Sequence, residues 1–406
     1  MIGDMWWMLL IFLFGLSAVM RYDVLLFFTL LLALASGASW LSFRTCLHGV
    51  VYRRRFRDGH IFCGEDTELT IEVQNAKPLP LAWLLIRDRF PPGLCLLVDD
   101  RAGGGQRETS PPDLKDMLVL RRYERIQRTY CLRGRRRGVY AFDSVTVTAG
   151  NLFGLEHKSA RLGGVDQLVV YPKLVPVERL ALPFERPAGR VRARRRIVED
   201  PLRVASVREY VPGDSARYIH WKNTARTSQL QTKVFDPEAS RVLTVVVDLQ
   251  TSHDPYSQVP EYLELAITAA ASIAVHALDQ RQAVGLCVNG GPPDTHHWTF
   301  IPPGRHHRQG PRILETLAPL EGFRTLALSQ LLYRAMPALP YGSTVLAVTA
   351  QTTDPVLIAL LSLQDAGHPV VLLTVGDRRP VVPATFTTFH LGGRDAWRSL
   401  EALALA

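Results

Sequence analysis

The sequence predicts three parts in succession: an N-terminal transmembrane helical hairpin, an all-β sandwich domain and a doubly wound α/β domain. Two long apolar runs stand at the start of the chain, and short strands with frequent turns follow as far as about residue 183. After residue 242, continuous apolar runs alternate with helical segments, which is typical of a parallel sheet covered by helices. We therefore expect domains at residues 1–44, 45–185 and 186–406.

The predicted hairpin consists of the apolar runs 5–20 and 24–43, which are separated only by Arg21-Tyr22-Asp23. Each run approaches or reaches the length that a membrane-spanning helix needs. A signal peptide is the alternative, but Asp4 and the absence of a basic segment before the apolar run argue against it.

Basic residues follow the hairpin, whereas its short internal loop has one Arg and one Asp. The positive-inside rule therefore predicts a two-pass protein whose bulk is cytoplasmic. The same side chains suit acidic head groups of membrane lipids. They are Arg44, Arg53, Arg54, Arg55 and Arg57.

The β region shows period-two alternation most clearly at residues 68–73 and 144–148. Shorter strands are expected at 83–86, 130–132 and 168–171, and a flexible loop at 103–112. The basic run 133–137 is interpreted first as a solvated turn or strand end and second as a phosphate contact.

The α/β region begins with a β-branched run that leads directly into Asp248, as expected for a buried central strand. The alternation that follows predicts a doubly wound fold. We expect strands at 242–247, 283–288, 344–348 and 370–375, and helices at 262–278, 313–317 and 354–365.

Between these regions, residues 208–235 combine a tight turn, a short helix and a strand. Pro212-Gly213 favours the turn, and Asp214 is expected to cap the helix that follows. On one continuous helix, Arg217, Trp221 and Ala225 would share a face. Residues 229–235 are expected to form the strand.

The charges of this segment allow two interpretations. In the first, Arg208 and Arg226 clamp Glu209 or Asp214 in a structural ion network. In the second, Arg217, Trp221 and Lys222 belong to a surface that binds an anion or a partner. We expect Arg208, Asp214 and Arg226 to be mainly structural, and Arg217 and Lys222 to lie nearer the surface.

This segment resembles the signature of the family known as domain of unknown function 58. The resemblance rests on Arg208-Glu209-Tyr210, Pro212-Gly213-Asp214, Arg217, Ile219, Trp221, Ala225-Arg226, Leu230 and Lys233. Upstream motifs are similar too, namely residues 136–140, 151–155 and 170–172. The resemblance implies a bacterial inner-membrane protein with a von Willebrand factor A-like α/β domain. It also implies two partners, a MoxR-type AAA+ ATPase and a membrane protein with a transglutaminase-like domain.

In domains of that kind a metal commonly binds an Asp-x-Ser-x-Ser motif after the first strand, and oxygen ligands suit Mg²⁺. Here Asp248 and Ser252 fit the motif, whereas Gln250 replaces a hydroxyl. The resemblance thus allows Mg²⁺ as a cofactor, but we expect this degenerate site to hold none. We expect no other cofactor.

The sequence favours binding over catalysis. The net charge of +9 suits an anionic membrane surface or nucleic acid, and five scattered cysteines argue against a disulfide framework or a zinc site. Two alternatives stay open: a metal-dependent hydrolase using Asp248, and a nucleic-acid binder using the basic runs 133–137 and 190–196. Those runs lack interleaved aromatic residues, so nucleic acid is not the expected partner.

Overall fold

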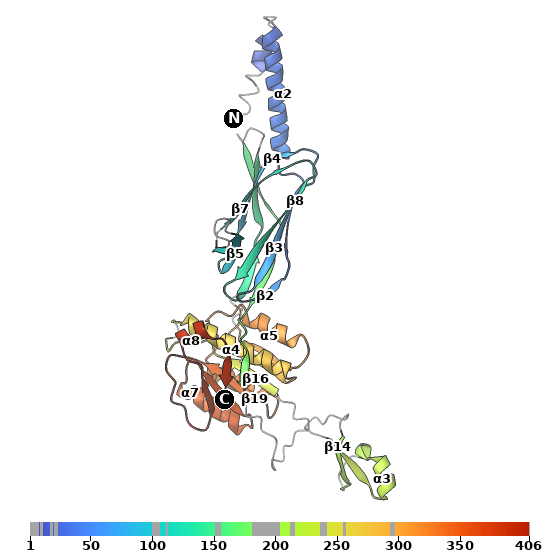
Figure 1. The fold of residues 1–406 in the computed structure, drawn as a ribbon, viewed down its shortest axis with the longest axis vertical. Helices are drawn as coiled ribbons and strands as arrows, with labels where there is room; N and C mark the ends of the chain where they lie inside the picture. Colours follow the sequence, from blue (N-terminus) through green and yellow to red (C-terminus); the bar gives the residue numbers. More distant parts are fainter. Residues whose placement is uncertain are drawn as a thin grey trace. The chain divides into compact units, whose positions relative to one another are not determined.

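A computed structural model describes residues 8, 11–16, 19, 23–99, 106–110, 113–150, 156–180, 204–211, 216–235, 242–254, 257–292 and 297–405. The chain forms two compact units, residues 1–171 and 172–406 (Figure 1). The fold is mixed α/β, with antiparallel sheets in the first unit and a largely parallel sheet in the second. The three-part division at residues 44 and 185 stays a prediction.

Helix α2 (Asp23–Thr45) matches the second predicted apolar run. Two helices of the described residues are long and apolar enough to span a membrane, at Leu26–Thr45 and Pro260–Asp279. They differ in burial, since 11% of the first and 67% of the second is buried within the protein. The second is therefore a core helix of the second unit. Of the first predicted run, residues 8, 11–16 and 19 are described and are helical, and the others lie outside the described residues.

The first unit contains three sheets. The first has the order β1-β3-β8-β5-β6, with strands Val50–Phe56, Asp66–Asn75, Arg125–Gly134, Leu94–Asp99 and Gln106–Thr109. The second has the order β11-β10-β4-β7, with strands His157–Leu162, Val145–Gly150, Leu81–Arg89 and Asp113–Leu120. The third has the order β2-β12-β9, with strands His60–Phe62, Asp166–Tyr171 and Gly138–Phe142. All pairs are antiparallel except β2 with β12.

Alternating residues of these strands fill one hydrophobic core that includes Leu69, Leu84, Leu132 and Phe142. Each strand turns every second side chain inward, which is the physical basis of the pattern that predicted it. The predicted loop at 103–112 is wrong in its centre, because Gln106–Thr109 pair with β5 as strand β6.

Strand β1 corrects the expectation that all five arginines after the hairpin serve the membrane. Arg53 and Arg55 are exposed, but Arg54 points inward beside Tyr52, and its side chain is only 1% exposed. Its guanidinium bonds to both oxygens of Asp88, with Nε and Nη2 each 2.8 Å from a carboxylate oxygen. Strand alternation therefore places this charge in the core, where it cannot meet a lipid head group.

Two arginines of the basic run 133–137 bond to carboxylates. Arg133 donates to both oxygens of Asp66 and to Glu108, and Arg135 donates to Glu108 as well. The bonds from Arg135 and then Arg133 lower the pKa of the Glu108 carboxyl. Arg133 and Arg135 are thus engaged with carboxylates rather than presented to phosphate.

Lys77, in the connection between β3 and β4, bonds to the end of α2. Its ammonium donates to the Thr45 carbonyl at 2.6 Å and also to the Cys46 carbonyl. The residue is buried, and burial lowers the pKa of the Lys77 ammonium. A cation at the carbonyl end of a helix interacts favourably with its partial negative charge.

The second unit is built on a six-stranded sheet with the order β18-β17-β16-β19-β20-β21. Its strands are Thr299–Gly304, Ala283–Val288, Val242–Val247, Thr344–Thr349, Val370–Thr374 and Thr387–His390. All are parallel except the edge strand β18. The helices are α4 (Pro260–Asp279), α5 (Gln309–Leu317), α6 (Leu328–Ala335), α7 (Asp354–Asp365) and α8 (Arg394–Ser399).

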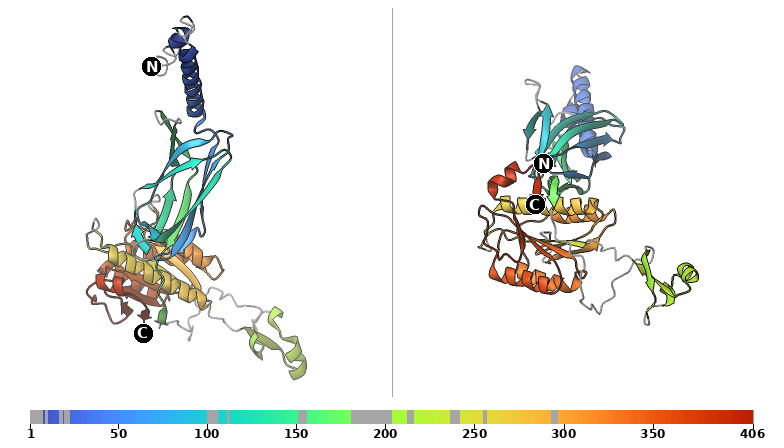
Figure 2. Two further views of the ribbon diagram at one scale, coloured as in Figure 1. Left: turned by 45° about the horizontal axis from the view of Figure 1, so that its top comes forward. Right: turned by 60° about the horizontal axis from the view of Figure 1, so that its bottom comes forward.

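Helices α4 and α5 cover one face of this sheet, and α6 and α7 cover the other (Figure 2). The small strands β13 (Val177–Leu180) and β22 (Leu403–Leu405) pair with each other. After β16 the chain turns first to β17 and later to β19, on opposite sides of β16. This reversal is the switch point at which open α/β sheets bind ligands, outside the carboxyl ends of the strands.

Candidate functional site

The signature segment forms a small module of its own. Strands β14 (Val204–Glu209) and β15 (Gln231–Phe235) pair in antiparallel fashion, and between them lie a 3-10 turn, Ala216–Tyr218, and helix α3, Trp221–Thr227. The predicted strand is thus confirmed at residues 231–235. Pro212, Gly213, Asp214 and Ser215 lie outside the described residues.

The predicted single helix is wrong, because Ile219 interrupts it. Ile219 is buried and forms a β-bridge with Thr232. His220 then caps α3, since its Nδ1 accepts from the backbone N–H of Asn223 at 3.1 Å. Arg217 and Trp221 therefore belong to separate turns, and the N-cap of α3 is His220.

The cap at His220 gives a first prediction. His220→Ala should weaken α3 by about 1 kcal/mol, the usual contribution of an N-cap side chain. His220→Asn should retain most of the stability, because Asn is a good cap. Hydrogen exchange of the α3 amides in the full chain measures the effect. Equal protection of α3 in the parent and in His220→Ala would contradict the capping role.

The module exposes four cations and an aromatic residue. Arg208, Arg217, Lys222 and Arg226 are all exposed, as is Glu209, so burial does not divide them into structural and surface groups. Arg208 donates to the Glu209 carbonyl, and Arg217 stacks on the Tyr218 ring with 5.0 Å to its centroid. Trp221 is 66% exposed. We call Arg217, Trp221, Lys222 and Arg226 the basic-aromatic surface.

A second cluster lies at the carboxyl edge of the parallel sheet, where Asp248 follows β16. Its carboxylate is 3% exposed and accepts from Asn289 Nδ2 at 2.6 Å, Thr349 Oγ1 at 2.7 Å and the Gln250 backbone N–H at 3.0 Å. Asn289 follows β17 and Thr349 ends β19, so three neighbouring strands contribute. Sequence analysis found Asp248 but missed both partners.

The same cluster shows how Gln250 departs from the metal motif. Its amide oxygen accepts from Arg324 Nη1, and its amide nitrogen donates to the Ser252 carbonyl at 2.9 Å. The Arg324 guanidinium lies near enough to Asp248 to favour its charged carboxylate.

These contacts do not fit a Mg²⁺ centre. Both Asp248 oxygens face hydrogen-bond donors, and a guanidinium lies where repulsion would oppose a divalent cation. In the described part of the chain, no three His, Cys, Asp or Glu side chains cluster in a way that could hold a metal ion. Asp248 instead holds three strand ends together.

Burial raises the pKa of Asp248 above its usual value. Its hydrogen bonds from Gln250, Thr349 and Asn289 act in the opposite direction, because they stabilise the charged form. Burial has the larger influence on the pKa, so the charged form of Asp248 lowers the stability of the folded protein.

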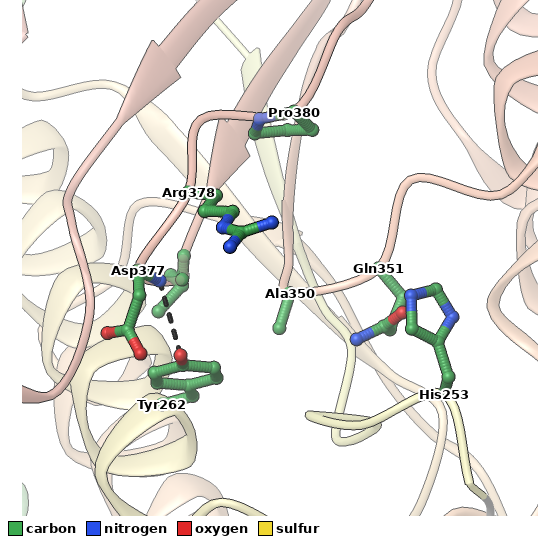
Figure 3. A pocket seen from close by; sticks show the side chains of 9 residues that line it. His253, Tyr262, Ala350, Gln351, Asp377, Arg378 and Pro380 are labelled. Carbon is green, nitrogen blue, oxygen red and sulfur yellow. Dashed lines mark hydrogen bonds between the residues drawn. The ribbon is translucent and has the colours of Figure 1, made fainter.

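A pocket of about 340 Å³ opens at the same edge of the sheet (Figure 3). Residues after β19 and β20, the first turn of α4 and the loop after β16 line it. The lining residues are His253, Tyr262, Ala350, Gln351, Val375, Gly376, Asp377, Arg378 and Pro380. Sequence analysis missed this pocket because its residues come from four separate segments.

Some solved structures resemble part of the chain. They include a CARDB domain from Pyrococcus furiosus in complex with di-metal ions (10% identity, TM-score 0.19) and a non-cellulosomal cohesin from Archaeoglobus fulgidus (9%, 0.21). Each match covers 30% of this chain and 91% of the other. At TM-scores this low, no conclusion about fold or function follows.

Two sequence comparisons are informative. The uncharacterized protein YeaD of Bacillus subtilis (strain 168) is 28% identical over 249 residues, which cover 58% of this chain and 55% of YeaD. The chain thus spans about half the length of that relative. Residues 206–380, which include the signature module and the Asp248 cluster, match the model of the family described as protein of unknown function DUF58. Over this segment the chain is similar to the DUF58 family.

Proposed function

We propose that this protein is a membrane-anchored interaction scaffold whose basic-aromatic surface captures an acidic partner protein. The observation that supports the proposal is Trp221, a large aromatic side chain that is 66% exposed beside exposed cations. Trp and Arg are the residue types most enriched where interfaces gain their affinity. A module that exposes a Trp and several cations therefore suits a partner that offers carboxylates and an apolar pocket.

The partner of this surface is a MoxR-type AAA+ ATPase in our proposal, and the joint activity is assembly or remodelling of a protein complex. A membrane protein with a transglutaminase-like domain is the further partner. Both rest on the family resemblance. The charge of the module supports a protein partner with an acidic face, because complementary charge speeds association and fixes register.

The architecture that we propose for this scaffold is more specific than mixed α/β. Two features support a β-sandwich in the first unit and a von Willebrand factor A-like domain in the second: the antiparallel sheets share one core, and the central strands order β17-β16-β19-β20. The 20-residue apolar segment of α2, with Arg44 in its last turn, supports an anchor in a bacterial inner membrane with the bulk of the chain cytoplasmic.

Catalysis by the Asp248 region is the less favoured function. A general base must lie within hydrogen-bond reach of the proton that it removes, whereas the Asp248 side chain is buried and its oxygens accept from three internal donors.

Capture of the ATPase by variants of the full chain tests the proposal. Arg217→Ala and Lys222→Ala should each reduce capture, yet each should cost under about 1 kcal/mol of stability, as exposed charges do. Arg312→Ala, an exposed arginine on α5, is the matched control and should leave capture unchanged. Retained capture in both module variants, or an equal loss in Arg312→Ala, would remove the basis of the proposal.

A further inference from the structure

The pocket at the carboxyl edge has one cation that points into it. Arg378 reaches from the loop after β20 toward Ala350 and Gln351, across the open centre of the pocket (Figure 3). Within the part of the chain that the structure describes, no salt bridge involves Arg378. A guanidinium at the wall of a concave site is therefore available to a ligand.

The neighbouring carboxylate does not compensate this charge. Asp377 points away from Arg378 in Figure 3, and its Oδ1 accepts from the backbone N–H of Arg394 at 3.1 Å. The hydroxyl of Tyr262, and then that N–H, lower the pKa of Asp377. Gly393 permits this approach, since a side chain there would place its Cβ 1.7 Å from Asp377 Oδ1. Asp377 thus accepts a hydrogen bond from Arg394, the first residue of helix α8. Arg378 is left as the charge that faces the pocket.

The opposite wall provides further polar groups. His253 and Gln351 also line the pocket, across from Arg378 in Figure 3, and the Gln351 carboxamide donates to the Thr251 carbonyl at 3.4 Å. Tyr262 lies in the first turn of α4, the end of a helix that favours anions. The pocket volume falls at the lower end of the range for small-ligand sites, which is about 300–1,000 Å³.

We propose that this pocket binds the phosphate group of a small phosphorylated compound, with Arg378 as the principal anion-binding residue. Guanidinium donates two parallel N–H groups to phosphate oxygens, and it stays charged at all physiological pH values. The location outside the carboxyl ends of β19 and β20 is where parallel α/β sheets bind ligands. A soluble phosphate ester and a lipid head group share this chemistry.

Calorimetric titration of the detergent-solubilised full chain with inorganic phosphate, glycerol 3-phosphate and dihexanoyl phosphatidic acid tests the proposal. Arg378→Ala should raise the Kd for inorganic phosphate by at least about tenfold, because it removes a bidentate charged contact. Arg379→Ala is the matched control: it removes an adjacent exposed arginine that does not line the pocket, and its Kd should stay within about twofold.

The outcomes distinguish a soluble phosphate ester from a lipid head group as the ligand, and both from a pocket that binds no phosphate. Tighter binding of glycerol 3-phosphate than of the phosphatidic acid assigns a soluble ligand, and the reverse order assigns a lipid; both support the pocket. Absence of binding by all three probes overturns the proposal. So does an equal loss in the Arg378→Ala and Arg379→Ala variants, since that would reflect general charge only. Neither result bears on capture of a partner by the basic-aromatic surface.

Discussion

Asp88→Ala should destabilise the protein by about 3–5 kcal/mol, the usual cost of breaking a buried ion pair, because the remaining partner Asp166 is 40% exposed and lies 3.4 Å from Arg54 Nη1. Asp88 and Arg54 have side chains that are 4% and 1% exposed, and two bonds of 2.8 Å join them. Tyr52 donates to the same carboxylate at 2.8 Å, and burial, then Asp88, raise the pKa of its phenol, so it remains a donor. Equilibrium unfolding of the full chain in detergent and urea measures the loss.

Two comparisons make this result specific. Arg53→Ala and Arg55→Ala remove exposed charges on either side of Arg54 and should change stability by no more than about 0.5 kcal/mol. Replacing both partners, as in Arg54→Met with Asp88→Leu, should recover part of the stability, because no unpaired buried charge remains while the buried Tyr52 hydroxyl still loses its acceptor. A loss of similar size in the Arg53→Ala variant would show that the strand, rather than the buried pair, is sensitive.

Asp248→Ala should cost roughly 1–3 kcal/mol, because it leaves the buried Asn289 amide without its acceptor. Asp248→Asn should be as stable as the parent or more stable at neutral pH. Its side-chain oxygen can accept from Asn289 and Gln250, its nitrogen can donate to Thr349, and Thr349 Oγ1 can donate to the Gln351 carbonyl at 3.1 Å. The substitution also removes the cost of burying a charge.

The pH dependence of unfolding distinguishes this role from a metal site. The folded-state pKa of Asp248 is raised, so its contribution to stability is fully present below the unfolded pKa and is lost as pH rises through the folded value. The advantage of Asp248→Asn over the parent should therefore grow with pH in that window and then level off. Mg²⁺ should leave both unfolding temperatures unchanged. A Mg²⁺-dependent rise in the parent that Asp248→Asn abolishes would contradict our interpretation.

Regular apolar patterns allowed much of the fold to be predicted. Strand β17 and helix α7 have the predicted bounds, 283–288 and 354–365, because β17 is a continuous buried run and the buried residues of α7 recur at helical spacing. Strand β1 was missed because its inward positions include Arg54, and a charge at an inward position hides the alternation. Helix α6 was missed as well, since its eight residues are too few to establish a period.

The residues of the candidate site were harder to predict from the sequence than the strands and helices. Asp248 could be placed at a strand end, but its partners Asn289 and Thr349 lie 41 and 101 residues further along the chain. Only the strand order brings them together. In the signature module, Ile219 decides against a continuous helix because it pairs with Thr232, a tertiary contact that overrides helical propensity.

The bonds from Lys77 to the end of α2 also restrict how this helix can move relative to the sheets of the first unit. Asn75 braces the connection that carries Lys77, since its amide donates to the Leu79 and Arg121 carbonyls at 2.9 Å each. Cys46, next to the helix end, donates to the Ala149 carbonyl of β10. A helix joined by a loose linker would swivel freely, whereas this joint couples tilt or rotation of α2 to the sheets. Helix α2 is thus joined to the sheets by several hydrogen bonds rather than through a flexible linker.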